Sequence, residues 1–254
     1  MTPTIYYHNL LALGVLSGTN TDEAYPVRRV ADADLTLPWP IISGVGAQPG
    51  VISGEATVTL ASGATRDSFV LAEGAGLSGF TIRVYSHDVD GGNLALHGDF
   101  PRASDLPFVS GLSGVTTPRR VWAVAVSGST SGLAIPSISE MMLATRLDFP
   151  RRPQIGVNRA TIHQASRIEI PGGAPFKFRL GDQLHRVDYS MIVEESALSG
   201  FETFLDVNDG GEFFWFADDL GDEYWAEVPT AEHTFDDQAG VYLFQLLVQE
   251  VPNE

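Results

Sequence analysis

The chain has no cysteine. It therefore forms no disulfide, carries no thiol nucleophile and offers no thiolate ligand to zinc. Positive charge is also scarce, because 15 basic residues, among them a single lysine (Lys177), stand against 32 acidic ones and give a net charge of −17. Nucleic acids and anionic lipid surfaces are bound by clustered Lys and Arg. The composition therefore predicts no nucleic-acid partner and no attraction to an anionic membrane surface.

Long apolar runs are missing as well. No stretch approaches the ~18 consecutive apolar residues of a membrane-spanning helix, so we expect no membrane insertion. The first residues, MTPTIYYHNLLALGVLSG, contain an apolar stretch but neither a preceding basic segment nor an A-x-A-like cleavage site. A secretory signal peptide has both features. We therefore expect a protein that is made in the cytoplasm of the cell producing it.

The first half of the chain consists of short runs of β-branched and aromatic residues, separated by turns of Gly, Ser, Asp and Asn. Residues 80–86 show the pattern most clearly, because Phe80, Ile82 and Val84 alternate and therefore share one face of a strand. Such runs at a spacing of ~8–12 residues are typical of an antiparallel β-sandwich or barrel. The runs are residues 51–53, 56–60, 68–71, 80–86, 120–126 and 135–143.

A pair of arginines between two prolines, residues 150–153 (PRRP), interrupts the strand pattern and is typical of an extended linker. Charge changes at the same point, because residues 1–148 hold 13 acidic and 8 basic side chains, whereas residues 149–254 hold 19 and 7. The two differences, −5 and −12, account for the net charge of −17. We therefore predict two domains, residues 1–148 and 149–254.

The second domain contains the best helix candidate in the chain, residues 194–207 (EESALSGFETFLDV), which ends at an Asn-Asp-Gly-Gly stop signal. Strand patterns flank this segment, and residues 241–251 (VYLFQLLVQEV) form a long one. The predicted fold class is mostly β, with two antiparallel β-sandwich domains and a single α-helix flanking the second. The apolar stripe of the helix consists of Leu198, Phe201, Phe204 and Leu205.

Residues 210–228 (GGEFFWFADDLGDEYWAEV) contain the densest group of aromatic residues. An acidic turn around Gly221 separates two aromatic runs, which predicts a β-hairpin. Strand alternation places large apolar residues on both faces, Phe213 and Trp215 on one and Phe214 and Phe216 on the other. Both faces must be covered, either by the core of the domain or by a second subunit, since aromatic residues are enriched at interfaces. The candidate interface anchors are Phe213, Trp215, Tyr224 and Trp225.

The sequence lacks the short motifs that mark common enzyme sites. Its six histidines form no close metal-binding pair, and no G-x-S-x-G, P-loop or dinucleotide-binding glycine motif occurs. We therefore predict no catalytic residue, no cofactor and no metal ion, and a protein that is not an enzyme.

Two acidic clusters leave alternatives open. Residues 88–93 (DVDGGN) offer oxygen ligands as a calcium loop does, but they lack the full calcium-loop pattern and also have the composition of a hairpin turn. The second cluster is a solvated turn, a cation site or a pair of glycosidase carboxylates, which would lie ~5 Å apart across a sugar cleft. It consists of Asp218, Asp219, Asp222 and Glu223.

Three stretches of the first domain resemble a known family: residues 9–12 (NLLA), residues 25–32 (YPVRRVAD) and Pro38-Trp39. They resemble the opening of discoidin-like (galactose-binding-like) jelly rolls in tail proteins of long-tailed bacteriophages, and residues 122–126 and 135–143 resemble the closing strands. The second domain is similar, in the order of its elements, to tail-tube and distal-tail-type proteins. Those are β-sandwiches with one flanking helix that assemble into rings.

These resemblances imply a non-enzymatic structural component of the tail tip or baseplate of a siphophage, located in the virion. The implied partners are other phage tail proteins and further copies of the chain, in a trimer or hexamer ring. The alternative is a carbohydrate-binding module that contacts host surface glycans, with Trp39, Tyr85 and His87 as candidate glycan contacts. A third hypothesis is a glycan-cleaving tail enzyme that uses Asp218, Asp219 or Glu223.

Overall fold

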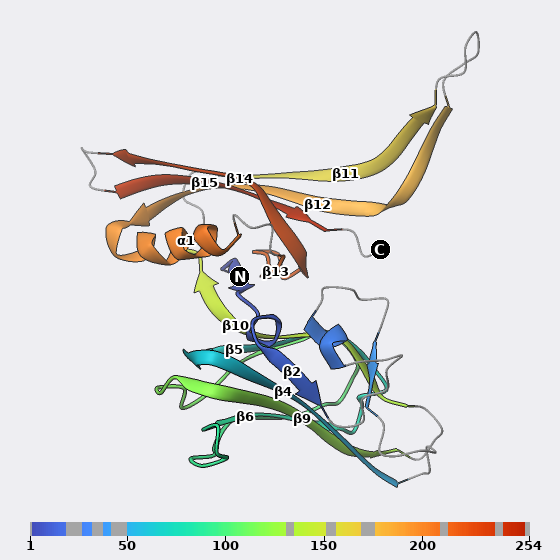
Figure 1. Ribbon diagram of the computed structural model, residues 1–254. Helices are drawn as coiled ribbons and strands as arrows, with labels where there is room; N and C mark the ends of the chain where they lie inside the picture. The colour runs from blue at the N-terminus through green and yellow to red at the C-terminus, as the bar shows by residue number, and fades with distance from the viewer. Residues whose placement is uncertain are drawn as a thin grey trace. The chain divides into compact units, whose positions relative to one another are not determined.

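The computed structural model of the chain forms two compact units (Figure 1). Of the described residues, the first unit, here called the helix unit, contains those in 2–7 and 147–251, and the second, the sandwich unit, contains those in 8–146. The sequence-based division after Asp148 did not anticipate that the first seven residues group with the C-terminal part of the chain. The structure describes residues 2–18, 27–31, 38–41, 50–130, 135–150, 156–168, 176–208, 213–236 and 241–251.

Two antiparallel sheets build the sandwich unit, which also contains the short 3-10 helices η1 (Leu10–Ala12) and η2 (Val27–Ala31). The larger sheet has the strand order β2 (Val15–Gly18), β4 (Gly50–Ala64), β9 (Arg119–Thr130), β6 (Thr81–His87) and β7 (Ala95–Pro101). In the other sheet, β5 (Ser68–Ala75) lies between β10 (Ser137–Asp148) and β8 (Phe108–Gly111), and β3 (Trp39–Pro40) also pairs with β10.

The core of this unit lies between its two sheets, as strand alternation predicts. In β6, Ile82 and Val84 point inward and are fully buried, and in β9 Trp122 and Val124 do the same. Their partners come from the second sheet and include Phe69, Leu71, Ile138, Met141 and Leu143. The mostly β fold class with antiparallel sheets, predicted from the sequence, is thereby confirmed.

Strand β4 differs from the prediction. Residues 51–53 and 56–60 were expected to be separate strands with a Ser-Gly turn between them, but they form one strand of 15 residues. Gly54 lies inside this strand, and a Cβ atom at that position would be 2.6 Å from Cγ2 of Ile41. A glycine at this position therefore permits the close approach of another segment, which is a common role of glycine within strands.

A single antiparallel sheet forms the framework of the helix unit, and α1 (Glu195–Asn208) covers one of its faces (Figure 1). Its strand order is β11 (Gly156–Ile168), β12 (Phe176–Glu194), β15 (Val241–Glu250), β14 (Glu223–Asp236), β13 (Phe214–Ala217) and β1 (Thr4–Tyr7). No helix among the described residues has the length and apolar character needed to cross a membrane.

The helix packs on the sheet through the stripe predicted from the sequence. Leu198, Phe201 and Phe204 are buried, and the Phe204 ring meets the Phe214 ring edge-on at a centroid distance of 5.1 Å. The predicted helix and the predicted aromatic hairpin are both confirmed, since β13 and β14 pair with Trp215 opposite Trp225.

Two strands continue beyond the rest of this sheet. Residues 186–194 of β12 pair with β15, but residues 176–185 pair with β11 alone. Figure 1 shows β11 and β12 running past the ends of β14 and β15, at the end of the sheet opposite α1. We call residues 161–168 and 176–185 the arm.

Candidate functional site

The most favourable surface for a ligand is the outer face of the larger sheet in the sandwich unit. Strand alternation turns Tyr85 and His87 away from the core, because their neighbours Val84 and Ser86 are fully buried. Register places Tyr85 opposite Ala123 of β9, and Ala123 opposite Thr57 of β4. Glu55 precedes Thr57 on the same face of β4. We call Glu55, Thr57, Tyr85 and His87 the tyrosine face.

A hydrogen-bonded group fixes the tyrosine ring. The Tyr85 hydroxyl donates to Oε2 of Glu55, and Thr57 Oγ1 donates to the other carboxylate oxygen at 2.9 Å. Burial raises the pKa of Tyr85 above its ordinary value, and the hydrogen bond and charge of Glu55 raise it further. The phenol therefore remains a protonated donor near neutral pH, and its ring is held in place at the surface, half-buried.

His87 extends this surface along the strand. Its ring lies nearly parallel to that of Tyr85, with a centroid distance of 6.4 Å and an interplanar angle of 25°. Nδ1 of His87 is 2.6 Å from the carbonyl oxygen of Asp88. Because a carbonyl only accepts hydrogen bonds, Nδ1 carries the proton, and Nε2 of the neutral ring is an acceptor.

A hollow of about 590 Å³ begins where the tyrosine face ends, since Asp88 and Val89 of its lining directly follow His87. This volume is within the range of small-molecule sites, ~300–1,000 Å³. Exposed apolar side chains surround the same β6–β7 hairpin, so the hollow combines charged lining residues with an apolar surrounding. The lining consists of Gly63, Asp88, Val89, Pro118 and Arg120, and the exposed apolar residues are Val89, Leu94 and Leu96.

Residues 88–93 form a hairpin turn. Asp88 accepts hydrogen bonds from Asn93 and Arg119, which together lower the pKa of its carboxyl group. Asp90 accepts from the backbone N–H of Gly92 at 3.0 Å, and Gly91 adopts a φ of 81° that favours glycine. Within the described ranges, no group of three or more His, Asp or Glu side chains is placed to hold a metal ion.

Trp39 is not at the surface. Its side chain is fully buried in the core of the sandwich unit, where β3 pairs with β10. The sequence analysis offered Trp39 as a glycan contact, and this burial corrects that expectation, because the ring presents no face to a sugar. Of the three candidate glycan contacts, the structure brings Tyr85 and His87 together and puts Trp39 in the core.

The acidic turn of the aromatic hairpin is built around Asp218, which is buried. Its Oδ1 atom accepts hydrogen bonds from the backbone N–H groups of Leu220, Gly221 and Asp222, at 2.7, 2.8 and 3.0 Å. Asp219 forms an ion pair with Arg159 and accepts from the Tyr189 hydroxyl at 3.2 Å. The contacts of both carboxylates are those of a turn and its anchor to the neighbouring strands.

The candidate interface anchors are mostly inaccessible in a single chain. Trp215, Tyr224 and Trp225 are buried, whereas Phe213 is 40% exposed. The Trp215 and Trp225 rings pack edge to face at a centroid distance of 5.6 Å, and Tyr224 belongs to the core beneath α1. Among the four, Phe213 is therefore the residue that a partner could reach in this structure.

Ser86 and His97 form a serine–histidine contact in the core of the sandwich unit. Ser86 Oγ is 2.7 Å from Nε2 of His97, and Nδ1 of His97 is 2.9 Å from the carbonyl oxygen of Ser113. Both side chains are buried, and the His97 ring stacks on Trp122. The ring is therefore oriented by a backbone carbonyl, and the pair stabilises packing.

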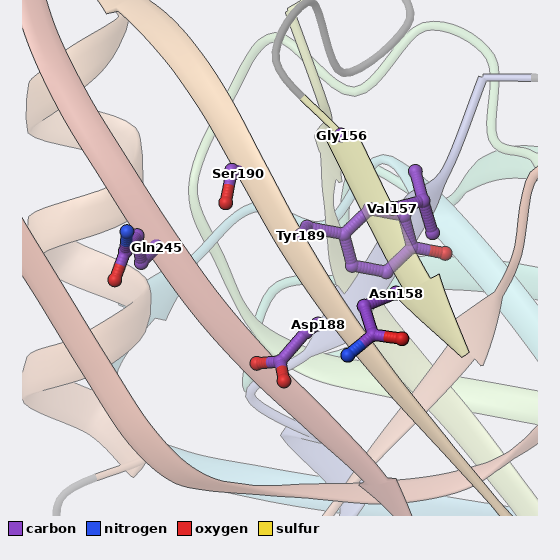
Figure 2. Close-up of a pocket in the computed structure, with 7 residues that line it drawn as sticks. All are labelled: Gly156, Val157, Asn158, Asp188, Tyr189, Ser190 and Gln245. Atoms are coloured by element: carbon purple, nitrogen blue, oxygen red, sulfur yellow. The ribbon is translucent and has the colours of Figure 1, made fainter. Parts of the chain in front are cut away.

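A polar hollow of about 390 Å³ lies on the sheet of the helix unit (Figure 2). Figure 2 shows Asn158 beside Asp188 and Val157 beside Tyr189, as the register of β11 and β12 requires. The ring of Tyr189 is buried against Phe149 and Phe216, so it offers no stacking surface. This hollow therefore supplies hydrogen-bonding groups without the aromatic platform that the tyrosine face has.

No protein-family model matches the chain, and no curated protein matches it. Among solved structures, a Clostridium perfringens module in complex with GlcNAc-α-1,4-galactose is 22% identical, with 55% of this chain and 94% of that chain covered and a TM-score of 0.39. A chitosan-binding module from Paenibacillus sp. IK-5 is 18% identical (54% and 98% covered, TM-score 0.41). The family 32 carbohydrate-binding module of Streptococcus pneumoniae EndoD is 16% identical (54% and 99% covered, TM-score 0.41).

These three similar structures are sugar-binding modules. Each is covered almost completely by about half of the present chain. None of the three bears on the phage-tail prediction.

Glu55 and Thr57 are the site residues that the sequence did not reveal. Their alternation with Ala56 and Val58 places them on the outer face of a strand, but nothing in that pattern connects them with Tyr85. The connection depends on β9 lying between β4 and β6, and that strand order is a property of the fold.

Proposed function

We propose that the sandwich unit is a non-catalytic, discoidin-like carbohydrate-binding module and that it binds a sugar on the tyrosine face. The observation that carries this proposal is the pair of nearly parallel rings, Tyr85 and His87, beside the Glu55 carboxylate. A pyranose has an apolar C–H face and a rim of hydroxyl groups. The C–H face packs well on an aromatic surface, and the hydroxyl groups donate hydrogen bonds to a fixed acceptor.

Glu55 contributes an oriented carboxylate. Its two oxygens receive hydrogen bonds from Thr57 and Tyr85, which fix the carboxylate beside the two rings. Nε2 of His87 adds another acceptor. Sugar hydroxyl groups therefore meet groups that are already oriented, which reduces the entropy lost on binding.

The test is a glycan screen followed by calorimetric titration of the full chain, with GlcNAc-α-1,4-galactose and chitosan oligosaccharides included among the ligands. We expect Tyr85→Ala to weaken binding at least ~10-fold, which corresponds to ~1.4 kcal/mol. Leu106→Ala is the matched control, because Leu106 is 70% exposed on the same unit and lies outside the tyrosine face.

Two outcomes would count against the proposal in different ways. A folded Tyr85→Ala variant that binds as tightly as the wild type would show that sugar binds elsewhere on the chain. Absence of binding to every glycan at millimolar concentration would remove the function itself.

A structural role in an assembly, such as the predicted phage tail tip with its partner proteins, is the second candidate function. The observation that favours it is the arm, whose strands extend beyond the sheet that they belong to. A two-stranded ribbon is only marginally stable by itself, so contact with a partner surface would stabilise the arm.

A further inference from the structure

The polar hollow of the helix unit is lined by side chains whose hydrogen-bonding groups are not used within the described structure. These side chains are Asn158, Asp188, Ser190 and Gln245, all labelled in Figure 2. We propose that this hollow, on the face of the sheet opposite α1, binds a sugar that carries no acidic group. The site lies outside the tyrosine face and does not depend on sugar binding by the sandwich unit.

Strand alternation and register bring these side chains onto one face of the sheet. In β12, Tyr189 is buried in the core beneath α1, so its neighbours Asp188 and Ser190 point to the opposite face. Asn158 of β11 pairs with Asp188, and Gln245 of β15 pairs with Ser190. Neighbouring strands are ~4.8 Å apart, and residues two positions apart on one strand are separated by ~6.6 Å. The polar groups therefore surround one small area.

Gly156 keeps this area open. It pairs with Ser190 and so belongs to the same face. A Cβ atom at Gly156 would have no atom within 4 Å in the described structure, and its φ lies outside the left-handed region. Neither crowding nor backbone conformation therefore requires a glycine here. A glycine within a strand often marks the close approach of a ligand, and a side chain at this position would occupy part of the hollow.

The lining groups suit the hydroxyl groups of a sugar. The amides of Asn158 and Gln245 each donate and accept hydrogen bonds, and so does the hydroxyl of Ser190. The Asp188 carboxylate only accepts. Because a sugar hydroxyl donates and accepts through a single oxygen, neighbouring hydroxyls of one ring can satisfy all of these groups. The volume of about 390 Å³ is within the range of small-molecule sites, ~300–1,000 Å³.

An apolar border adjoins the polar groups. Ile192 follows Ser190 by two residues in β12 and pairs with Leu243 of β15, so both lie on the face that carries the hollow. Leu243 is 38% exposed, and Ile192 is half-buried. The C–H groups of a sugar can cover this border and remove apolar surface from water. A polar hollow beside an apolar border thus matches both parts of a sugar.

Charge disfavours acidic ligands at this site. Asp188 is the one charged residue among the described residues that line the hollow. Arg186, two residues before Asp188 in β12, lines a different hollow near the acidic turn. Carboxylate, sulfate and phosphate groups are recognised chiefly by Arg and Lys, and here they would meet a carboxylate. The fitting ligand is therefore a neutral sugar and not a uronic acid, a sulfated sugar or a nucleotide.

The test is calorimetric titration of the full chain carrying Tyr85→Ala, so that the tyrosine face does not contribute. Chitotriose, maltotriose and GlcNAc-α-1,4-galactose are the neutral probes, and an oligogalacturonate is the acidic one. We expect at least one neutral probe to bind at millimolar concentration, and the acidic probe to bind at least ~10-fold more weakly. Adding either Gly156→Val or Asp188→Ala should weaken binding of the neutral probe at least ~10-fold.

Gly111→Val is the matched control, because Gly111 is also an exposed strand glycine with an ordinary φ but belongs to the sandwich unit. Valine is well suited to strands, and the Asp188 side chain is exposed, so thermal unfolding should show that both hollow variants fold.

The proposal is overturned if no neutral probe binds the Tyr85→Ala chain, or if Gly156→Val and Asp188→Ala both leave binding unchanged. It is also overturned if Gly111→Val loses binding to the same extent, or if the oligogalacturonate binds as tightly as the neutral probes. The wild type reports separately on the tyrosine face. If it binds no better than Tyr85→Ala, the function proposed for that face fails while the hollow remains a site.

Discussion

The hydroxyl of Tyr85 reaches across strand β9 and donates a hydrogen bond to the carboxylate of Glu55. The intervening residues on that face of β9 are Ala123 and Ala125, whose small side chains leave the space that this contact needs. With its hydroxyl bonded to Glu55 and its ring beside that of His87, Tyr85 is oriented before a ligand arrives.

Substitutions at Tyr85 should separate stacking from hydrogen bonding. Tyr85→Phe keeps the ring but leaves Glu55 without one donor, so we expect sugar binding to weaken ~3-fold, less than the ~10-fold of Tyr85→Ala. Calorimetric titration measures both. Equal losses for the two variants would mean that the hydroxyl group, and not the ring, makes the decisive contact.

Trp39 should matter for stability and not for binding. Trp39→Ala removes a fully buried ring and should lower the free energy of unfolding by ~3–5 kcal/mol. Trp39→Phe should cost less, since the indole N–H of Trp39 has no hydrogen-bond partner in the described structure. Urea unfolding measures both values. A variant with normal stability and lost sugar binding would contradict the buried placement.

Asp218 should behave as a structural residue of the hairpin. Asp218→Ala leaves three backbone N–H groups without their acceptor, and we expect a loss of ~2–3 kcal/mol. Asp218→Asn retains one acceptor oxygen and should lose less. Asp222→Asn is the control, because the Asp222 side chain is exposed. Chemical denaturation compares the three, and an unchanged Asp218→Ala variant would argue against this role.

His8 should make the sandwich unit less stable in mild acid. Burial lowers the pKa of His8, and the nearby charge of Arg66 lowers it further. The unfolded state therefore binds a proton more readily, so the stability linked to His8 is complete above pH ~6.5 and is lost as the pH falls below it. His8→Asn removes the titrating ring and tolerates the local φ of 59°. Thermal unfolding between pH 7.5 and 5.5 should show a smaller decrease for His8→Asn than for the wild type.

Local patterns in the sequence predicted the elements that depend on local chemistry. Helix α1 follows from the spacing of Leu198, Phe201 and Phe204 and from its glycine-rich stop. The aromatic hairpin follows from two aromatic runs around Gly221, which has a φ of 96°. Tyr85 and His87 were recognised as candidate contacts because both lie near a turn at the end of a strongly alternating strand.

Features that depend on distant segments were not predictable in this way. The Ser53-Gly54 pair has the composition of a turn, but it pairs with Ser127 and Val126 of β9 and stays within a long strand. Trp39 lies between prolines as a loop residue would, yet pairing of β3 with β10 carries it into the core. Glu55 joined the site only through the order of β4, β9 and β6.

The pairing of β1 with β13 has a consequence for how the chain is made. Strand β1 is synthesised before its partner at Phe214–Ala217, which follows more than ten seconds later at ~5–20 residues per second. The sandwich unit, encoded between them, is complete well before that. One strand of the helix unit is therefore made long before the strands that it pairs with. Removal of Met1–Tyr7 should destabilise the helix unit and leave the sandwich unit folded.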